Sequence, residues 1–282
     1  MIPAEFDYVR ADSVDGALSA LADGGEDAKL LAGGHSLLPL MKLRLAAPTL
    51  LVDIGGLDEL RGVERRNGGW RIGPLTTHAT LQDSDDLGVV AKAASLIADQ
   101  QVRNRGTIGG SLAHGDPASD LPGVLLAFDG SVTARGGGGD REIAAADLFQ
   151  DYLTTSLDPA ELITSVSIPA LEGYGWGYEK FTRRAEDWAM VGVVALVKAA
   201  GGTCEDVRIG LTHMGSTPLR ASAAEDALRG GPLDAERIAA AAEHAADGTE
   251  PPGDANATPD YKRHLARVLT RRALESAAAG AA

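Results

Sequence analysis

Two glycine-rich turns are the residues of this chain best suited to hold an anion. The first contains Gly33 and Gly34 and the second contains Gly109 and Gly110, and each follows a hydrophobic run and precedes a segment of helical character. Glycine lacks a β-carbon, so its backbone approaches a ligand closely, and consecutive N–H groups at a helix start present partial positive charge. The pair of turns predicts a clamp for a diphosphate.

Side chains next to the glycines add hydrogen-bond donors. His35 and Ser36 follow the first pair, whereas Thr107 and Ser111 flank the second. Each turn can also be read as a tight connection or a packed loop, and His35 as a structural histidine. Neither turn fits the nucleotide patterns G-x-G-x-x-G or G-x-x-x-x-G-K-[ST], so we expect a dinucleotide site of another kind, with FAD as its ligand.

Two acidic residues, Asp116 and Asp120, come shortly after the second turn. Carboxylates beside a nucleotide commonly accept hydrogen bonds from ribose hydroxyls. Asp120 also suits the N-cap of a helix expected over residues 120–128, and Asp116, which precedes Pro117, can simply begin a turn. Both readings stay open for each residue.

The composition limits the classes of partner. The chain has 282 residues, 44% of them hydrophobic, which is enough for a sizeable core in two domains or in one domain with lobes. A formal net charge of -14 argues against a nucleic-acid partner or an anionic membrane surface. The N-terminus lacks a basic region followed by an apolar stretch, and no run approaches the roughly 20 apolar residues of a membrane span. We therefore expect a cytoplasmic protein with no integral membrane segment.

Metal and nucleophilic chemistry are not expected in this chain. Cys204 is its one cysteine, so it cannot form an internal disulfide or ligate an iron–sulfur cluster by itself. His78 and His213 lack acidic or thiol residues at metal-ligand spacing, and we expect structural roles for both. With a single cysteine, any metal redox centre must lie on another chain. We assign no catalytic residue, because the chemistry expected of this chain needs no Ser/His/Asp arrangement or carboxylate pair.

Hydrophobic periodicity predicts an α+β protein in three parts, of which the first is a small βαβ-like lobe. Strands are expected at residues 6–10, 29–32, 49–54, 62–64, 70–72, 131–134, 162–168, 190–199 and 207–214. Helices are expected at residues 13–21, 37–43, around 80, and at 88–98, 120–128, 222–228, 234–244 and 258–276. Residues 136–139 predict a hairpin or loop, and the glycines of 173–177 mark the change to the third part.

Three segments resemble the flavin subunits and domains of the molybdenum hydroxylases, a family that includes the carbon monoxide and xanthine dehydrogenases. They are LLAGGHSLLPLMKLRL (30–45), NRGTIGGSLAHGDPASDLP (104–122) and YKRHLARVLTRRAL (261–274). The resemblance implies a two-lobed FAD-binding domain, with lobes at 1–55 and 56–175, followed by a smaller α+β C-terminal domain at 176–282.

The resemblance also implies which residues contact FAD. The two turns would wrap its diphosphate through Ala32, Gly33, Gly34, His35, Ser36, Thr107, Ile108, Gly109, Gly110 and Ser111. Asp120 would lie near the ribose, with Asp116 as a second carboxylate candidate. Leu162 or Ile163 would lie beside the flavin and Lys180 would touch the cofactor, although residues 180–188 by themselves read as a solvated charged face.

Two positions depart from the family pattern. Many relatives carry Asn or Asp where this chain has Ser111, whose hydroxyl still donates but has a shorter reach. Many carry Tyr where this chain has Trp188, which would either cover one face of the flavin or fill the interface between lobes. Either departure would alter the exposure of the flavin.

For function, the resemblance implies electron relay through FAD. A large partner subunit with molybdopterin would oxidise the substrate, and a small partner with [2Fe-2S] clusters would conduct electrons to FAD, which passes them to quinone, NAD or oxygen. The implied assembly is a dimer of heterotrimers of the carbon monoxide dehydrogenase type. Two alternatives stay open: a self-contained flavin oxidase or reductase, and a nonredox nucleotide-binding scaffold module.

The last expected helix is basic on an otherwise acidic chain. Its cationic residues would form either a solvated face or a docking surface for an acidic partner subunit. They are Lys262, Arg263, His264, Arg267, Arg271 and Arg272.

Overall fold

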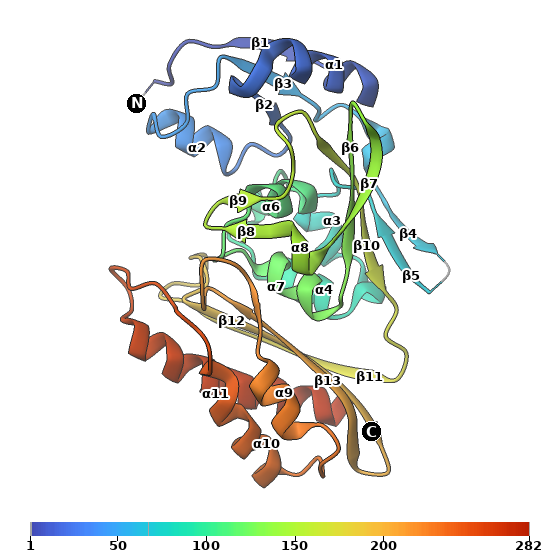
Figure 1. Cartoon of the computed structure of the whole chain (residues 1–282), viewed down its shortest axis with the longest axis vertical. Coiled ribbons are helices and arrows are strands. Elements are labelled where there is room, and N and C mark those ends of the chain that lie inside the picture. The colour runs from blue at the N-terminus through green and yellow to red at the C-terminus, as the bar shows by residue number, and fades with distance from the viewer. Residues whose placement is uncertain (1, 67, 282) are drawn as a thin grey trace.

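Three β-sheets, each covered by its own helices, follow one another along the long axis of the molecule (Figure 1). The computed structural model describes residues 2–66 and 68–281. Its mixture of helices and strands confirms the α+β class expected from the sequence. The limits expected for the lobes, at residues 55 and 175, stay a prediction.

The N-terminal part is a three-stranded parallel sheet in the order β1-β3-β2, made of β1 (Asp7–Arg10), β2 (Ala28–Leu31) and β3 (Leu50–Asp53). Helix α1 (Val14–Gly24) buries the stripe of Val14, Ala17 and Leu21 against it, and the Ser13 side chain caps the helix by accepting from the amide of Gly16. The first glycine turn leads from β2 into α2 (Leu37–Lys42). The predicted βαβ unit is therefore confirmed.

The middle part is a five-stranded antiparallel sheet in the order β4-β5-β10-β6-β7. Its strands are β4 (Val63–Arg66), β5 (Gly69–Ile72), β6 (Ser131–Gly136), β7 (Gly139–Ala144) and β10 (Leu162–Pro169). Its helices are α3 (His78–Gln82), α4 (Val89–Ser95), α5 (Gln100–Arg103), α6 (Ile108–His114), α7 (Asp120–Ala127) and α8 (Ala145–Leu148). A short hairpin of β8 (Phe149–Asp151) and β9 (Thr154–Thr155) lies beside α6.

Helix α7 joins the middle part to the C-terminal part. Every residue of α7 is buried, and the helix packs on strands β12 (Val191–Ala200) and β13 (Thr203–Thr212). A β-carbon at Gly210 would overlap the carbonyl oxygen of Gly123, so the backbones of helix and strand touch where both carry glycine. This close crossing sets Asp120, at the start of α7, beside the C-terminal sheet.

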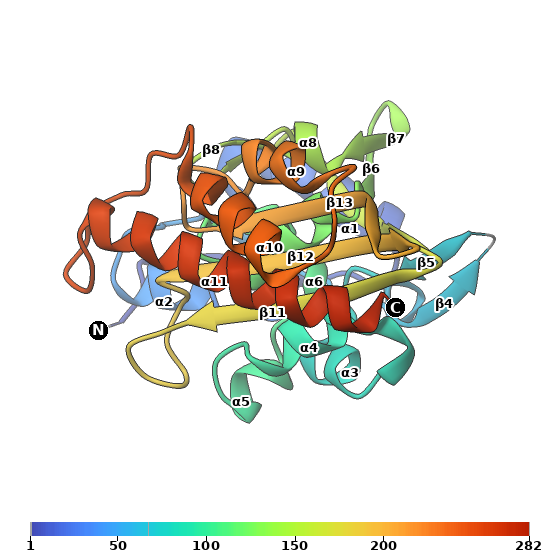
Figure 2. The ribbon, with the colours of Figure 1, turned by 90° about the horizontal axis from the view of Figure 1, so that it is seen from below.

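The C-terminal part is a four-stranded antiparallel sheet in the order β11-β12-β13-β14, which adds β11 (Tyr174–Phe181) and β14 (Leu219–Arg220). Helices α9 (Ser222–Leu228), α10 (Ala235–Ala242) and α11 (Pro259–Gly280) cover one face, and α11 runs along β11 and β12 (Figure 2). The helices expected at 222–228 and 258–276 are thus present. The described residues also form four short 3₁₀ helices, at Gly25–Asp27, Asp58–Leu60, Asp85–Leu87 and Glu243–Ala246.

Strand β11 was not expected from the sequence, which indicated instead a boundary between the second and third parts of the chain at residues 173–177. A β-carbon at Gly175 would overlap the carbonyl oxygen of Ala277, and one at Gly177 would overlap that of Ala273. These glycines let α11 lie directly on the strand. Tyr174, Trp176 and Tyr178 alternate as in a strand, but the glycines between them are disfavoured in strands and are explained only by the distant helix.

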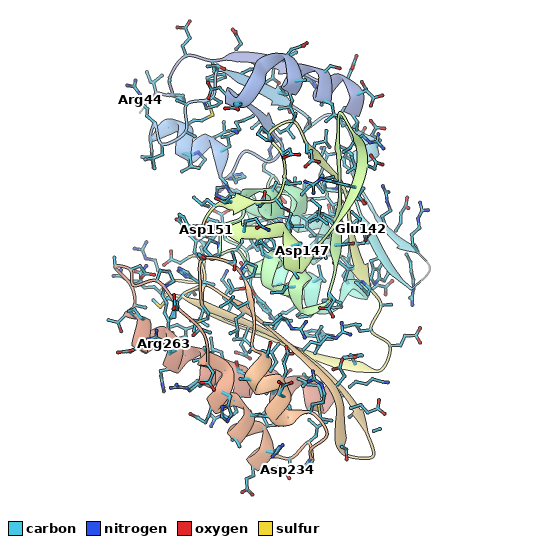
Figure 3. All side chains as sticks on the ribbon, viewed as in Figure 1. Arg44, Glu142, Asp147, Asp151, Asp234 and Arg263 are labelled. Atoms are coloured by element: carbon cyan, nitrogen blue, oxygen red, sulfur yellow. The ribbon has the colours of Figure 1, made fainter. Side chains whose placement is uncertain are left out.

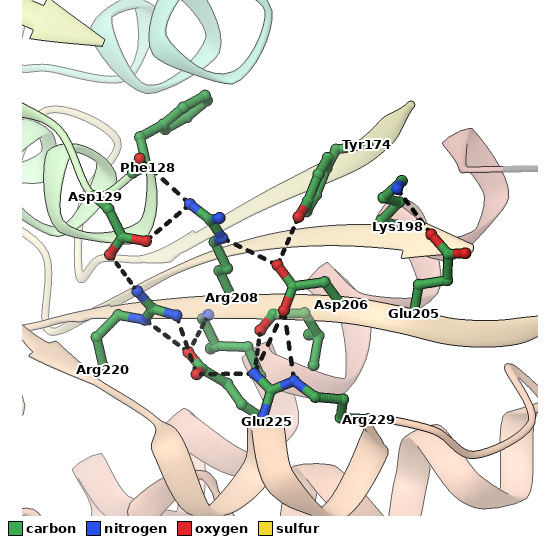
Figure 4. Close-up of polar contacts among 12 residues, drawn as sticks. Phe128, Asp129, Tyr174, Lys198, Glu205, Asp206, Arg208, Arg220, Glu225 and Arg229 are labelled. Atoms are coloured by element: carbon green, nitrogen blue, oxygen red, sulfur yellow. Dashed lines mark hydrogen bonds and ion pairs between the residues drawn. The ribbon is translucent and has the colours of Figure 1, made fainter. Parts of the chain in front are cut away.

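An ionic network holds the end of α7 on the C-terminal sheet (Figure 4). Arg208 pairs with Asp129 at 2.9 Å and donates to the carbonyl oxygen of Phe128. Arg220 pairs with Asp129 at 2.9 Å and with the carboxylate of Glu225 at 2.7 Å. These charge-assisted bonds link residues far apart in sequence and fix α7 against β13 and α9.

One basic residue of α11 is not exposed as the sequence led us to expect. Lys262 is fully buried, and its Nζ lies 2.7 Å from Asp254 and 3.2 Å from Nε2 of His213. The expectation that Lys262 belongs to an outer basic face is therefore wrong, because its position in α11 turns it toward the loop that carries Asp254. Arg263 of the same helix does project outward (Figure 3).

Charged side chains project from all three parts, as Arg44, Asp151 and Asp234 illustrate (Figure 3). Among the residues that the structure describes, no helix combines the length and the apolar character needed to cross a membrane.

Candidate functional site

A cleft of about 660 Å³ opens between the three parts of the chain. It is lined by residues from the two glycine turns, from the β8–β9 hairpin and the start of β10, and from the C-terminal part. The residues expected at a cofactor that line it are Ala32, Gly33, Gly34, His35, Ser36, Thr107, Gly109, Gly110, Ser111, Asp120, Leu162, Ile163, Lys180 and Trp188. Segments far apart in sequence therefore converge on one cavity.

Ile108 and Asp116 are the two expected residues that the structure does not bring to the cleft. Ile108 is 2% exposed and belongs to the core of the middle part. Asp116 accepts a hydrogen bond at 2.8 Å from the backbone amide of Ala118, which closes a local turn. The turn-forming reading of Asp116 is the one that the geometry supports.

The two glycine turns touch each other. A β-carbon at Gly33 would overlap the carbonyl oxygen of Arg105 and would come within 2.9 Å of the Cα of Gly106. Gly34 has φ of +79°, in the left-handed region that favours glycine. The first turn therefore requires glycine both for its conformation and for its contact with the chain that enters the second turn.

The first turn, residues 32–36, has free backbone donors. Within the part of the chain that the structure describes, the amides of Gly33, Gly34, His35 and Ser36 donate to no protein acceptor. Ser36 is the N-cap of α2, yet its side chain makes no capping bond. The backbone of the first turn is thus available to an anion in the cleft.

The second turn, residues 107–111, uses its backbone donors internally. The amide of Gly109 donates to the carbonyl oxygen of Pro74 at 2.8 Å, and the amide of Gly110 donates to Oγ1 of Thr107 at 3.2 Å. The amide of Ile108 similarly donates to Thr76. The expectation that the amides of Gly109 and Gly110 face the anion is therefore wrong. The Gly109 amide donates to the neighbouring segment, residues 74–78, and the Gly110 amide donates to the side chain that caps the helix.

What the second turn offers instead is hydroxyl groups. The Thr107 oxygen accepts from Gly110 but keeps its own proton for donation, and Ser111 is half-buried at the cleft. A β-carbon at Gly109 would overlap Pro74, so this glycine serves the contact between segments. The two turns thus resemble each other in sequence but present different chemical groups.

His78 is a cleft residue that the sequence indicated only as structural. It is 3% exposed, lines the cleft, and places Nε2 at 3.3 Å from Oγ of Ser111. Burial, together with His35 and Arg103, lowers the pKa of His78 to about 4. The contact that brings His78 to the cleft is a tertiary one: Thr77 caps α3 as Thr107 caps α6, and the two threonines form a β-bridge. No local sequence pattern marks it.

His213, by contrast, lies outside the cleft. Its Nδ1 lies 2.8 Å from the carbonyl oxygen of Ala189, and its other ring nitrogen faces Lys262. The structural role expected for His213 agrees with these contacts.

A buried ion pair forms another part of the cleft wall. Nζ of Lys180 lies 2.9 Å from Asp120 and donates to the carbonyl oxygen of Leu96 at the same distance, and the hydroxyl of Tyr178 donates to Asp120 at 2.5 Å. The side chains of Lys180 and Asp120 are 5% and 4% exposed. Burial raises the pKa of Asp120, although Lys180 and Tyr178 act against it.

These contacts decide against one of the two readings that the sequence left open for each residue, Asp120 and Lys180. Ser119, not Asp120, is the N-cap of α7, and Asp120 turns its carboxylate toward the C-terminal sheet. Lys180 is not part of a solvated face, because β11 carries it inward over the cleft.

Trp188 is 57% exposed and contributes to the cleft lining together with Glu186 and Asp187. Such exposure does not fit a residue that fills the interface between lobes. On the opposite side, Leu162 and Ile163 are buried at the start of β10, where the pairing with β6 is interrupted by a register shift. The cleft therefore combines a polar region at the turns with apolar side chains.

The cleft fits a dinucleotide by its size and donors. Its volume lies within the range of roughly 300–1,000 Å³ typical of small-molecule sites. Free amides at the first turn and hydroxyls at the second suit a diphosphate, and the glycine contact at Gly33 lets both reach it. Lys180 uses two of its three N–H groups within the protein, which leaves one for a ligand.

Two family models match this chain. Residues 4–171 match the family described as the FAD binding domain in molybdopterin dehydrogenase. Residues 176–277 match the CO dehydrogenase flavoprotein C-terminal domain.

Individual relatives match along nearly the whole chain. The alpha subunit of the 6-hydroxypseudooxynicotine dehydrogenase complex of Paenarthrobacter nicotinovorans is 42% identical, with 98% of this chain and 96% of the relative covered. The carbon monoxide dehydrogenase medium chain of Hydrogenophaga pseudoflava is 40% identical, with 98% of each chain covered. A solved structure of the carbon monoxide dehydrogenase of Hydrogenophaga pseudoflava, lacking the Mo-pyranopterin moiety, matches with a TM-score of 0.96, 42% identity and 100% of both chains covered.

Proposed function

The chain belongs to the FAD-binding flavoproteins of the molybdenum hydroxylase family, and we propose that it takes electrons from a partner subunit with [2Fe-2S] clusters and passes them to quinone, NAD or oxygen. Bound FAD supplies the redox chemistry, since a flavin accepts electrons singly and releases them in pairs. As an oxidoreductase subunit, the chain itself contributes binding, orientation and electrostatics.

The observation that carries this proposal is the meeting of the two glycine turns at one cleft. A β-carbon at Gly33 would collide with the backbone that enters the second turn, so the two turns act as one structure. The amides of the first turn would bind the FAD diphosphate, and the hydroxyls of Thr107 and Ser111 would approach it from the other side.

The remaining cleft residues would orient the flavin end. Leu162 and Ile163 would exclude water from one side, while Trp188 would cover an exposed face. Lys180, held by Asp120, would direct its remaining N–H toward the cofactor. Asp120 would then act near the ribose chiefly through the lysine that it positions.

The partners follow from what this chain lacks. Cys204 is its one cysteine and is fully buried, so the clusters would be held by a small [2Fe-2S] subunit and the substrate would be oxidised on a large molybdopterin subunit. We further propose a dimer of heterotrimers like that of a carbon monoxide dehydrogenase. Relatives 42% and 40% identical bear the names of different dehydrogenases, so the substrate would be set by the large subunit.

Titration of the purified full chain with FAD tests the binding step. We expect saturable binding with a flavin spectrum, and we expect Gly33→Ala to weaken it about tenfold or more, since overpacking at a close backbone contact costs roughly 1–3 kcal/mol. Gly138→Ala is the matched control, because no atom lies within 4 Å of a β-carbon built there. Circular dichroism would verify that both variants are folded.

Two results would contradict the proposal. One is the absence of saturable FAD binding by folded wild-type protein, and the other is equal FAD affinity in the two glycine variants. Co-purification from the source cell, followed by metal analysis and peptide identification, tests the partners. Isolation of the chain without molybdenum- or iron-containing partners would favour a self-contained flavoenzyme.

A further inference from the structure

His78 is a buried ionisable residue that local packing does not explain. Its Nε2 faces Ser111 at 3.3 Å, but its Nδ1 is buried and has no hydrogen-bond partner among residues 2–66 and 68–281. Buried polar atoms of native proteins are nearly always paired, so an unpaired ring nitrogen beside a ligand cleft calls for a functional account. We explain it through the hydrogen bond between Nε2 and Ser111.

The ring of His78 is held in place from several sides. Its backbone amide donates to the carbonyl oxygen of Gly106 at 2.9 Å, and a β-carbon at Gly106 would come within 2.8 Å of Cδ2 of the ring. The N-cap Thr77 fixes the start of the helix that carries it. The imidazole is therefore packed against the same chain that forms the second turn.

Two neutral tautomers are available to this ring, and they differ in their effect on Ser111. With the proton on Nδ1, a buried N–H would have no acceptor, and Nε2 would take the single hydroxyl proton of Ser111. With the proton on Nε2, the ring donates to the Ser111 oxygen, and the hydroxyl proton is free to point elsewhere. Orphaned buried N–H groups are rarer than under-satisfied acceptors, which favours the second arrangement.

The charge state of the ring agrees with this arrangement. Burial is the main cause that lowers the pKa of His78 to about 4, and its neighbours His35 and Arg103 act in the same direction. A neutral ring also avoids placing a second N–H at the buried Nδ1, which has no acceptor in the part of the chain that the structure describes.

We propose that His78 is a positioning residue that donates from Nε2 to Ser111 and thereby directs the hydroxyl proton of Ser111 to an anion in the cleft. The inference rests on the proposed function, with the diphosphate of FAD as the anion. It assigns the second turn its donor, since the amides of Gly109 and Gly110 are already used within the protein. The hydroxyl of Ser111 is thereby oriented for donation.

Nitrogen-15 NMR of the full chain with histidine labelling tests the tautomer directly. In the FAD complex at pH 7.5 we expect a protonated Nε2 and a bare Nδ1 for His78, with the resonance assigned by its loss in His78→Gln. A protonated Nδ1 or an imidazolium ring would overturn the proposal. This readout needs no activity and no folded variant other than the one used for assignment.

Three substitutions at the position separate a positioning role from a packing role. The amide nitrogen of Gln reaches the place of Nε2, whereas that of Asn reaches the place of Nδ1, and Met fills similar volume without a donor. We expect His78→Gln to keep FAD affinity within about threefold, and His78→Asn and His78→Met to lose about tenfold, the scale of a hydrogen bond to a charged group. Equal losses for all three would show packing alone and contradict the proposal.

A double-mutant cycle completes the test. Ser111→Ala should lose about tenfold in FAD affinity, and His78→Met/Ser111→Ala should lose no more than Ser111→Ala, because His78 acts only through the serine. Additive losses would overturn the inference while leaving the proposed function intact. Failure of the wild-type chain to bind FAD would instead defeat the proposed function itself.

Discussion

The two sides of the cleft are built differently although both contain a glycine turn. On the first-turn side, residues 33–36 present unpaired amides and no buried charge. On the second-turn side the amides are consumed, and the polar groups are side chains: Ser111 with His78, and Lys180 with Asp120.

The difference shows that a glycine motif does not by itself determine which atoms meet a ligand. The first turn follows a strand at the edge of the cleft, and within residues 2–66 and 68–281 no segment accepts its amides. The second turn lies beside residues 74–78, which accept from Ile108 and Gly109. Donor availability is therefore decided by the segment packed alongside, and each side should respond differently to substitution.

The largest expected contrast concerns buried charge. Lys180→Met would leave Asp120 buried without its cation, and we expect the free energy of unfolding to fall by about 3–5 kcal/mol. His35→Ala, at an exposed residue of the first-turn side, should change it by less than about 0.5 kcal/mol. Urea unfolding of FAD-free protein at pH 7.5 measures both. Similar losses would remove the proposed difference between the sides.

The next contrast is a pH dependence specific to His78. Its folded-state pKa is lowered from 6.5 to about 4, so between those values the unfolded chain binds a proton that the folded chain does not. Stability is therefore unaffected above about pH 6.5 and falls as the pH drops toward 4, by up to about 3 kcal/mol for a shift of this size.

Comparison of wild type with His78→Gln isolates this effect. His114 and His213, whose pKa values burial also lowers, contribute to both proteins and cancel in the difference. Parallel stability curves from pH 7.5 to 4 would show that His78 does not titrate in this way.

A smaller contrast concerns the glycines of the second turn. A β-carbon at Gly109 would overlap Pro74, whereas one at Gly110 would meet only Oγ1 of Thr107, at 2.9 Å. Gly109→Ala should therefore lower the free energy of unfolding by about 1–3 kcal/mol and Gly110→Ala by less. Thermal unfolding of FAD-free protein would show this order. The reverse order would contradict the close packing of the second turn against residues 74–78.

The smallest contrast compares the caps of the helices that follow the turns. Thr107 accepts from the amide of Gly110, so Thr107→Val should cost about 1 kcal/mol of stability. Ser36 makes no capping bond, and Ser36→Ala should change FAD-free stability by only a few tenths of a kcal/mol. Equal losses in urea unfolding would indicate that the first turn is capped after all.

Much of the fold could be predicted from local patterns. The βαβ unit followed from apolar runs around a capped helix at Ser13, and α11 from the signature of Thr258 and Pro259. Strand β11 could not be predicted in this way. Its Gly175 and Gly177 are explained only by α11, which lies against them from nearly a hundred residues further along the chain.

The candidate site divides in the same manner. The sequence marked both turns, and the family resemblance added Lys180. For Asp120 the sequence left an N-cap and a binding reading open, and for His78 it indicated a structural role. A carboxylate near the start of a helix resembles an N-cap in the sequence, even when it forms an ion pair with a distant lysine in the fold. Only the fold brings Lys180 and Tyr178 of β11 within hydrogen-bond distance of the Asp120 carboxylate.

The positions of the glycines in the sequence already show where the backbone can come close to a ligand, because glycine acts locally through its missing β-carbon and its freedom at positive φ, as at Gly34. Which groups remain to bind a ligand depends on the packing of distant segments. Hydrogen-bond donors are satisfied by whatever lies beside them, and for the second turn that neighbour is residues 74–78, while for the first turn it is the open cleft.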